Sequence, residues 1–216
     1  MSVDPAEFVR ANTVLAAPSL VPELKLHLAA VATDLWEATE ATLERTGLPP
    51  PYWAFAWPGG QALARHLLDR PEVARGKRVL DFAAGCGVAA LAAAKTSAAH
   101  ACASEIDDFA RAAMALNARA NGLTLEILDR DVLAPPAGDW ELILAGDVFY
   151  EKPMADRVWP WLRAAASRGA RVLVADPGRA YLPKDGLVEI ARYTVPTTLD
   201  LEDRTERVTR VLDVAR

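Results

Sequence analysis

The amino-acid sequence predicts an α/β fold built on a mostly parallel sheet of seven strands, with helices on both faces and an antiparallel edge. Three observations predict this fold. Short apolar runs alternate with helical patterns through the middle of the chain, as they do in right-handed βαβ units. Several of these runs are apolar almost throughout, which is typical of strands covered on both faces. After residue 176, two strand patterns follow without a useful helix between them, which favours an antiparallel pair.

The predicted elements follow in chain order. Residues 1–50 predict a helical and short-strand extension packed on the core, in which the strict alternation of 24–28 predicts a short half-exposed strand. Residues 51–216 predict the main domain. Its expected strands are Arg78–Phe82, His100–Ser104, Thr124–Asp129, Glu141–Asp147, Arg171–Asp176, Leu187–Val195 and Arg207–Val214. Its expected helices are Val88–Thr96, Asp108–Asn121 and Pro153–Ser167, and Pro160 is expected to kink the last of them.

Composition excludes several classes of protein. A chain of 216 residues with 52% hydrophobic content is long enough for one well-packed domain. Its net charge of −5 argues against a surface that neutralises phosphate backbones, so no nucleic acid is expected as a partner. Two cysteines are too few for a disulfide scaffold or a zinc cluster, and no metal site is expected. Without a secretory signal or a membrane span, we expect a cytoplasmic monomer.

The loop after the first expected strand of the main domain carries a glycine motif. Ligands of open α/β sheets bind at the carboxyl ends of the strands, and this strand runs into Ala83-Ala84-Gly85-Cys86-Gly87 before a helix. Taken alone, Gly85-x-Gly87-x-x-Ala90 fits a dinucleotide-binding fingerprint, with Glu105 near the position of a ribose-binding acid. Glycines at a strand-to-helix turn can equally be simple tight-turn residues.

Acidic residues at the strand ends favour a cationic ligand over a pyrophosphate. A pyrophosphate on a helix N-terminus disfavours a carboxylate such as Asp81 at the mouth of the loop. S-adenosylmethionine presents an ammonium and a sulfonium there instead. Glu105 could accept hydrogen bonds from its ribose hydroxyls, and Asp131 from its adenine amino group. Each acid alone also fits a solvated loop residue, but three acids at three successive strand ends predict an S-adenosylmethionine site.

Several stretches of the chain resemble the seven-strand protein-lysine methyltransferases. They are "PYWAFAWPGGQALARHLLD" (51–69), "VLDFAAGCG" (79–87), "ASEID" (103–107), "GDVFY" (146–150) and "DPGR" (176–179). The chain is most similar to the group that methylates the β subunit of electron transfer flavoprotein. The Gly-x-Gly loop is generic to class I methyltransferases, whereas Trp-Pro-Gly-Gly-Gln and Asp-x-x-Tyr are far more specific. The first twenty residues and those after 180 match only in length and in general character, without a shared motif.

The resemblance implies a Rossmann-like class I fold, S-adenosylmethionine as the cofactor and lysine ε-amines of a protein as the substrate, with electron transfer flavoprotein β subunit expected. It implies that Asp147 and Tyr150 lie where the amine meets the methyl donor, and that Asp147 orients this amine. The amides of the helix that begins near Pro58 would meet the cofactor carboxylate. The implied cofactor contacts are Trp57, Gly60, Asp81, Ala83, Gly85, Gly87, Glu105, Ile106, Asp131, Val132 and Gly146.

Some alternatives stay open at this point. Trp57 is compatible with a core aromatic, and 176–179 with either the substrate mouth or a plain turn. The amine could belong to another protein, such as a ribosomal one, to a small molecule or to a nucleic acid. Nucleic-acid amino-methyltransferases usually carry two prolines where Val148 and Phe149 stand here. A non-catalytic cofactor-binding module is the third possibility, but it would have no need for Asp147 and Tyr150.

Overall fold

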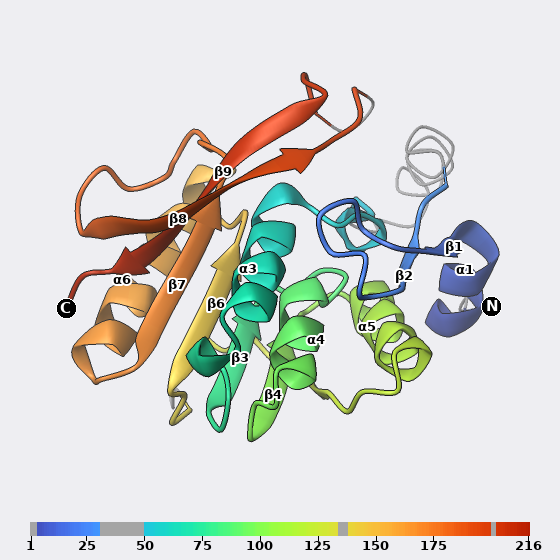
Figure 1. The fold of residues 1–216 in the computed structure, drawn as a ribbon, viewed down its shortest axis with the longest axis horizontal. Coiled ribbons are helices and arrows are strands. Elements are labelled where there is room, and N and C mark those ends of the chain that lie inside the picture. Colours follow the sequence, from blue (N-terminus) through green and yellow to red (C-terminus); the bar gives the residue numbers. More distant parts are fainter. Residues whose placement is uncertain (1–3, 31–49, 134–137, 200–201) are drawn as a thin grey trace.

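The computed structural model describes residues 4–30, 50–133, 138–199 and 202–216. Its centre is a seven-stranded sheet (Figure 1). The strand order is β5-β4-β3-β6-β7-β9-β8. The strands are β3 (Arg78–Phe82), β4 (His100–Ser104), β5 (Glu126–Leu128), β6 (Leu142–Gly146), β7 (Arg171–Asp176), β8 (Leu187–Pro196) and β9 (Glu206–Val214). Strands β3 to β7 are parallel, and β9 runs antiparallel between β7 and β8. The predicted sheet with an antiparallel edge is confirmed, although β5 is shorter than the expected Thr124–Asp129.

Helices cover both faces of the sheet, as predicted. They are α3 (Pro58–Asp69), α4 (Val88–Lys95), α5 (Asp108–Ala120) and α6 (Lys152–Ser167). Alternate strand residues divide between two cores: Leu142 and Leu144 of β6 pack with α3 and α4, whereas Ile143 and Ala145 pack with α6 on the other face. Helix α6 continues through Pro160. Within the described residues, no helix is long and apolar enough to cross a membrane.

The N-terminal residues pack against α5. Helix α1 (Pro5–Asn12) is capped by Asp4, whose Oδ1 accepts a hydrogen bond from Ala6 N at 2.8 Å. Strand β1 (Val14–Ala16) pairs antiparallel with β2 (Leu26–Leu28), which is the later part of the predicted 24–28 strand. Residues 31–49 of the predicted extension lie outside the described residues, and its boundary at residue 50 stays a prediction.

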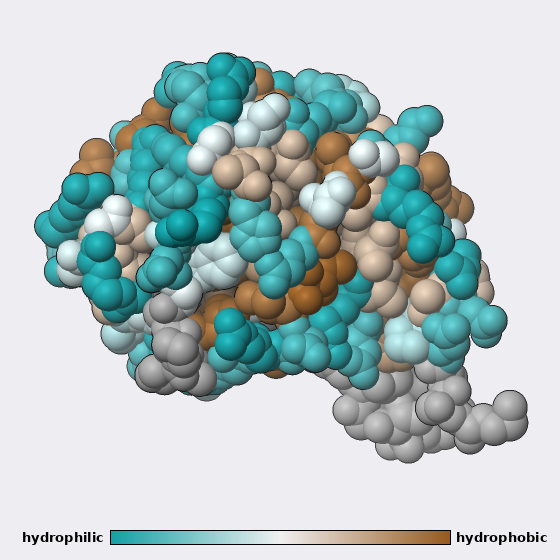
Figure 2. Space-filling view, turned by 90° about the horizontal axis from the view of Figure 1, so that it is seen from below, coloured by the Kyte–Doolittle hydropathy of each residue, from teal (hydrophilic) through white to brown (hydrophobic). Residues whose placement is uncertain are grey.

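The surface seen from below the view of Figure 1 is largely hydrophilic, with an apolar band across its middle (Figure 2). In Figure 1 the parallel strands run upward, so their carboxyl ends lie at the upper edge of the sheet. The loops that follow these strands therefore gather at one edge, where the sequence predicts the ligand site.

Candidate functional site

A cavity of about 990 Å³ lies at the carboxyl edge of the sheet. Ten of the thirteen predicted site residues line it: Trp57, Ala83, Gly85, Glu105, Ile106, Asp131, Val132, Gly146, Asp147 and Tyr150. The other three, Gly60, Asp81 and Gly87, lie behind these residues and do not line the cavity. Tyr52 and Arg179, which are not among these thirteen residues, also line it. The structure thus gathers residues from most of the chain at one opening.

The loop after β3 has an unusual backbone that leaves room for a ligand. Ala83 has φ +50°, Gly85 φ +53° and Gly87 φ +77°, all in the left-handed region. Gly87 is the N-cap residue of α4, and an added Cβ there would lie 2.9 Å from Met114 Cγ on α5. The buried Asn117 of α5 fixes the same loop, since its Nδ2 donates to Cys86 O at 2.9 Å. The loop is therefore shaped before any ligand binds.

Asp81 supports this loop from behind. Its Oδ2 accepts a hydrogen bond from Ala90 N of α4 at 2.9 Å, and the residue is only 3% exposed. Burial, followed by the nearby charge of Glu105, raises the pKa of Asp81 to about 8. The predicted contact between Asp81 and the cofactor ammonium stays a prediction, because Asp81 does not reach the cavity surface.

Glu105 and Ile106 follow β4 and face the cavity together. Glu105 Oε2 accepts from Gly85 N at 3.2 Å and its Oε1 from Ile106 N at 2.8 Å, while burial raises its pKa. The Ile106 side chain is 73% exposed. An acid that is fixed beside an uncovered aliphatic side chain suits a ligand with hydroxyl groups next to a flat apolar part. Ribose and adenine have these properties, so the residues fit S-adenosylmethionine.

Asp131 lines the same cavity as the glycine loop, and it has a partner that sequence reasoning missed. Arg157 of α6 pairs with its Oδ2 at 2.5 Å and lowers its pKa, while Leu133 N donates to its Oδ1 at 3.0 Å. A helical arginine with no motif around it carries no signal in the sequence.

Within the described residues, no group of three or more His, Cys, Asp or Glu side chains is placed to hold a metal ion.

Asp147, directly after β6, is buried and held on both carboxylate oxygens. Gly59 N at the start of α3 donates to Oδ2, and Arg179 Nε donates to Oδ1 at 2.8 Å. The residue has φ +57°, a conformation that aspartate tolerates better than most residues. Burial raises the pKa of Asp147 to about 6, and the Arg179 charge opposes a larger rise. The Gly59 amide, which was expected to lie free for the cofactor carboxylate, therefore binds a protein carboxylate instead.

Arg179 belongs to the 176–179 segment, for which a turn and a substrate mouth were both open. The segment is a turn, because Asp176 Oδ1 accepts from Gly178 N at 2.6 Å and from Arg179 N at 2.7 Å. It is also part of the site, because this turn directs the Arg179 guanidinium to Asp147. Local sequence indicated the turn, but nothing in it indicated a contact with a residue more than thirty positions earlier.

Aromatic side chains form the wall next to Asp147. Tyr150 is 38% exposed, and its ring centroid lies 5.6 Å from that of Tyr52. Tyr52 in turn lies 6.0 Å from Trp57, whose Nε1 donates to Tyr52 O at 2.8 Å. The Arg179 Cζ atom lies 5.9 Å from the centre of the Trp57 ring. Burial raises the pKa of Tyr150 to about 12, so its phenol is neutral at pH 7.

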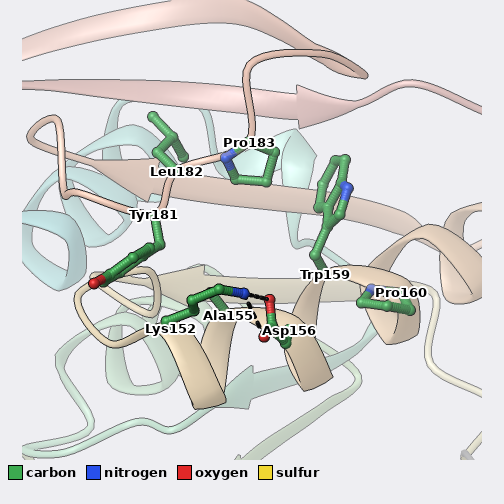
Figure 3. A pocket seen from close by; sticks show the side chains of 8 residues that line it. All are labelled: Lys152, Ala155, Asp156, Trp159, Pro160, Tyr181, Leu182 and Pro183. Atoms are coloured by element: carbon green, nitrogen blue, oxygen red, sulfur yellow. Dashed lines mark hydrogen bonds and ion pairs between the residues drawn. The ribbon is translucent and has the colours of Figure 1, made fainter.

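A second, smaller pocket of about 350 Å³ lies between α6 and residues 181–183 (Figure 3). Lys152 and Asp156 form an ion pair at 2.7 Å on one side, and Tyr181 lies opposite. Tyr181 N donates to Phe149 O at 3.1 Å, so this pocket adjoins the segment that carries Asp147 and Tyr150. The residues that line this pocket include no buried acid and no glycine loop, so the larger cavity is the candidate functional site.

Several solved structures with the same architecture are methyltransferases. Magnesium protoporphyrin IX methyltransferase from Synechocystis PCC 6803, with bound SAM, has a TM-score of 0.54 and 17% identity over 100% of this chain and 99% of that one. Ribosomal protein L11 methylase from Lactobacillus delbrueckii subsp. bulgaricus has a TM-score of 0.52 and 20% identity over 79% and 83%. Residues 56–158 match the family model "Methyltransferase small domain". The fold is therefore that of the class I methyltransferases.

Curated relatives name the family. The electron transfer flavoprotein beta subunit lysine methyltransferase of Rattus norvegicus is 40% identical over 88% of this chain and 76% of its own length. That of Mus musculus is 39% identical over 91% and 78%. A homolog from Caenorhabditis elegans is 35% identical over 81% and 77%. This chain belongs to the family of electron transfer flavoprotein beta subunit lysine methyltransferases, and it is a protein-lysine methyltransferase.

Proposed function

We propose that this enzyme transfers methyl groups from S-adenosylmethionine to lysine ε-amines of the electron transfer flavoprotein β subunit. The observation that carries the proposal is a buried carboxylate, Asp147, which is fixed beside an aromatic wall in a cavity that fits the methyl donor. The names of the relatives support this substrate. That the enzyme is monomeric and cytoplasmic, and does not act on nucleic acid, stays part of the proposal.

In this proposal, different residues of the cavity would hold different parts of the cofactor. Glu105 would accept hydrogen bonds from the ribose hydroxyls, and Ile106 and Val132 would pack on the adenine. The backbone of the loop at Ala83 and Gly85 would lie against the amino-acid part. When bound, S-adenosylmethionine supplies a methyl group activated by a sulfonium. Six carboxyl side chains line the cavity against two arginines, and both arginines are paired with acids. This charge balance favours a cationic ligand.

The residues near Asp147 prepare the amine for attack. A lysine ammonium has an ordinary pKa of about 10.4 and must release its proton to solvent before the nitrogen can react. Tyr150 and Trp57 remove water from around the amine, which favours its neutral form, and the positive charge of Arg179 has the same effect, whereas the Asp147 carboxylate favours the ammonium form. Asp147 therefore acts as an orienting group and is not the sole base. Asp147 accepts a hydrogen bond from the neutral amine and directs its lone pair. Positioning then supplies most of the catalysis, because the donor is already activated.

The test uses purified electron transfer flavoprotein β subunit and labelled S-adenosylmethionine. We expect label on lysine, located by mass spectrometry after proteolysis. Asp147→Asn keeps the size of the side chain and the ability to adopt a left-handed backbone conformation, but it removes the charge. It should lower kcat by about 100-fold or more, which is the scale for the loss of a preorganised polar group. Its affinity for S-adenosylmethionine should change little.

Asp156→Asn is the matched control, because Asp156 is an exposed acid on the neighbouring helix that pairs only with Lys152 in the described residues. It should retain wild-type turnover. Wild-type enzyme that labels arginine, nucleic acid or only other proteins would refute the proposed substrate. Asp147→Asn with normal turnover would refute the role of the acid.

A further inference from the structure

Two buried carboxylates share one guanidinium at the edge of the cavity. Arg179 Nη2 lies 2.7 Å from Asp147 Oδ1 and 2.6 Å from Glu202 Oε1. Arg179 Nε also donates to Asp147, and its Nη1 donates to Glu202 Oε2 at 3.3 Å. The side chains of Asp147, Arg179 and Glu202 are 10%, 19% and 4% exposed. The guanidinium is therefore held from two sides and is mostly buried.

Glu202 reaches this place from a distant part of the chain. It lies in the connection between β8 and β9 and does not line the cavity. Arg207 of β9 also donates to it, with Nε at 3.0 Å and Nη2 at 2.8 Å from Glu202 Oε2. The adjacent acid, Asp203, pairs with the same Arg207 but is 69% exposed, and none of its contacts in the described residues reaches Arg179. Glu202 thus contacts Arg179 and Arg207, whereas its neighbour lacks the link to the cavity.

The arrangement determines which acceptor positions of Asp147 remain available. A carboxylate offers about four lone-pair positions. Gly59 N uses one on Oδ2, and Arg179 Nε and Nη2 use those on Oδ1. One position on Oδ2 is left for an incoming amine. If Arg179 were not held by Glu202, its whole charge would face Asp147, and its donors could compete for that last position.

We propose that Glu202 is a positioning residue for methyl transfer, which holds Arg179 in one place so that Asp147 keeps one acceptor position free for the substrate amine. This inference rests on the proposed role of Asp147 as the acceptor of the lysine amine. It adds the connection between β8 and β9 to the machinery of the site, although no atom of Glu202 touches the cavity.

The pH dependence of the site follows from the groups that surround Asp147. Arg179 faces it from the loop after β7, Asp176 from the end of β7 and Tyr150 from its own segment, while the first turn of α3 contributes an amide and no acid. Glu202 acts through Arg179. Without the Glu202 charge, the positive charge of Arg179 is no longer partly neutralised, so it lowers the pKa of Asp147 further. Loss of Arg179 itself raises the pKa of Asp147.

The first experiment compares Glu202→Gln with Asp203→Asn in the full-length enzyme, with the protein substrate that the wild type methylates. Glu202→Gln should lower kcat by about tenfold or more, the scale for a misplaced reacting group, with little change in S-adenosylmethionine affinity. In its kcat/KM profile, the acid limb that belongs to Asp147, which lies below the limb of the substrate lysine, should move to lower pH. Asp203→Asn should keep the wild-type kcat and profile. Equal losses in both variants, or an unmoved acid limb in Glu202→Gln, would overturn the proposal.

Two arginine variants keep the inference testable if Glu202→Gln does not fold. Arg179→Gln should move the acid limb to higher pH by about one pH unit or more, because Asp147 loses its neighbouring cation. Arg179→Lys should leave the limb near its wild-type position but lower kcat at least about fivefold, since one ammonium cannot hold two carboxylates in a fixed geometry. Wild-type kcat in Arg179→Lys would overturn the proposal. Failure of the wild type to methylate electron transfer flavoprotein would instead contradict the proposed substrate alone.

Discussion

Asp147 combines two features that proteins seldom place in one residue, a buried carboxylate and a positive φ. Each feature costs free energy on its own. Here the Gly59 amide and the Arg179 guanidinium hold the carboxylate, and the Asp147 amide donates to Ala175 O at 3.0 Å, which extends the pairing of β6 with β7. The surrounding structure thus compensates for both costs and leaves the carboxylate at the cavity, where the substrate amine would arrive.

Asp81 gives a residue-scale prediction about stability and pH. Its pKa of about 8 in the folded protein lies above the ordinary value of aspartate, so the folded state binds the proton more tightly than the unfolded state. Its contribution to the free energy of unfolding is therefore present at low pH and is lost as the pH rises toward 8. Asp81→Asn keeps a side-chain oxygen for the Ala90 amide and removes the charge. At pH 8 it should be more stable than the wild type by at least about 1 kcal/mol.

Urea unfolding at pH 5, 6.5 and 8 without ligand measures this effect. The difference between Asp81→Asn and the wild type should grow with pH. Asp139→Asn, a change at an exposed acid near the start of β6, should show no such trend. A constant difference across the three pH values would mean that the buried carboxyl of Asp81 does not carry a raised pKa.

At the scale of elements, the junction of α3 with β6 determines the position of Asp147. Gly59 and Gly146 allow the two backbones to touch. An added Cβ on Gly59 would lie 2.5 Å from Ala175 O and 2.6 Å from Asp147 N, and one on Gly146 would lie 2.7 Å from Gly60 N. The Trp-Pro-Gly-Gly segment therefore acts as a docking contact between a helix and two strand ends, in addition to any role in binding the cofactor.

Gly59→Ala should consequently destabilise the protein by about 1–3 kcal/mol, the range for overpacking, and lower kcat because α3 and Asp147 must separate. Gly60→Ala is the matched control in the same turn. Its Cβ would meet only the Val88 Cγ1 methyl at 3.0 Å, and the gain in helix propensity offsets this contact. Thermal unfolding and steady-state kinetics of both variants check the expectation. Equal stability of the two variants would show that the close approach of the backbones at Gly59 does not make an added Cβ destabilising.

At the scale of the whole molecule, the parallel sheet brings loops from most of the chain to one edge. Segments near residues 57, 83, 105, 131, 147 and 179 all line one cavity. Binding of a ligand there should stabilise the entire domain, because the residues that hold the ligand come together only in the folded state.

We therefore predict that S-adenosylmethionine at about one hundred times its Kd raises Tm by about 5 °C or more. At this concentration, binding adds about 2.7 kcal/mol to the free energy of unfolding. NADH should leave Tm unchanged, because a pyrophosphate would meet the acids of this cavity. Differential scanning calorimetry with each ligand measures both values. Glu105→Gln should reduce the shift produced by S-adenosylmethionine. Stabilisation by NADH equal to that by S-adenosylmethionine would contradict the assignment of the cavity.

The sequence alone determined the strand positions to within a few residues, the alternation with helices, the antiparallel edge, and the acids and glycines at the strand ends. These features are local, since apolar periodicity and turn residues act over a few neighbouring positions. The short β5 was the least well predicted strand, and α1 with β1 was anticipated only as unspecified helical and strand structure.

Only the tertiary structure determined which distant side chains meet. It placed β9 between β7 and β8, turned Asp81 behind the glycine loop, paired Asp131 with Arg157, and joined Asp147 to Arg179 and Glu202. Arginine and glutamate are common on protein surfaces, and no local pattern distinguishes the few that are buried against each other. Their partners depend on how the helices and the β8–β9 connection pack on the sheet, which is a property of the folded chain as a whole.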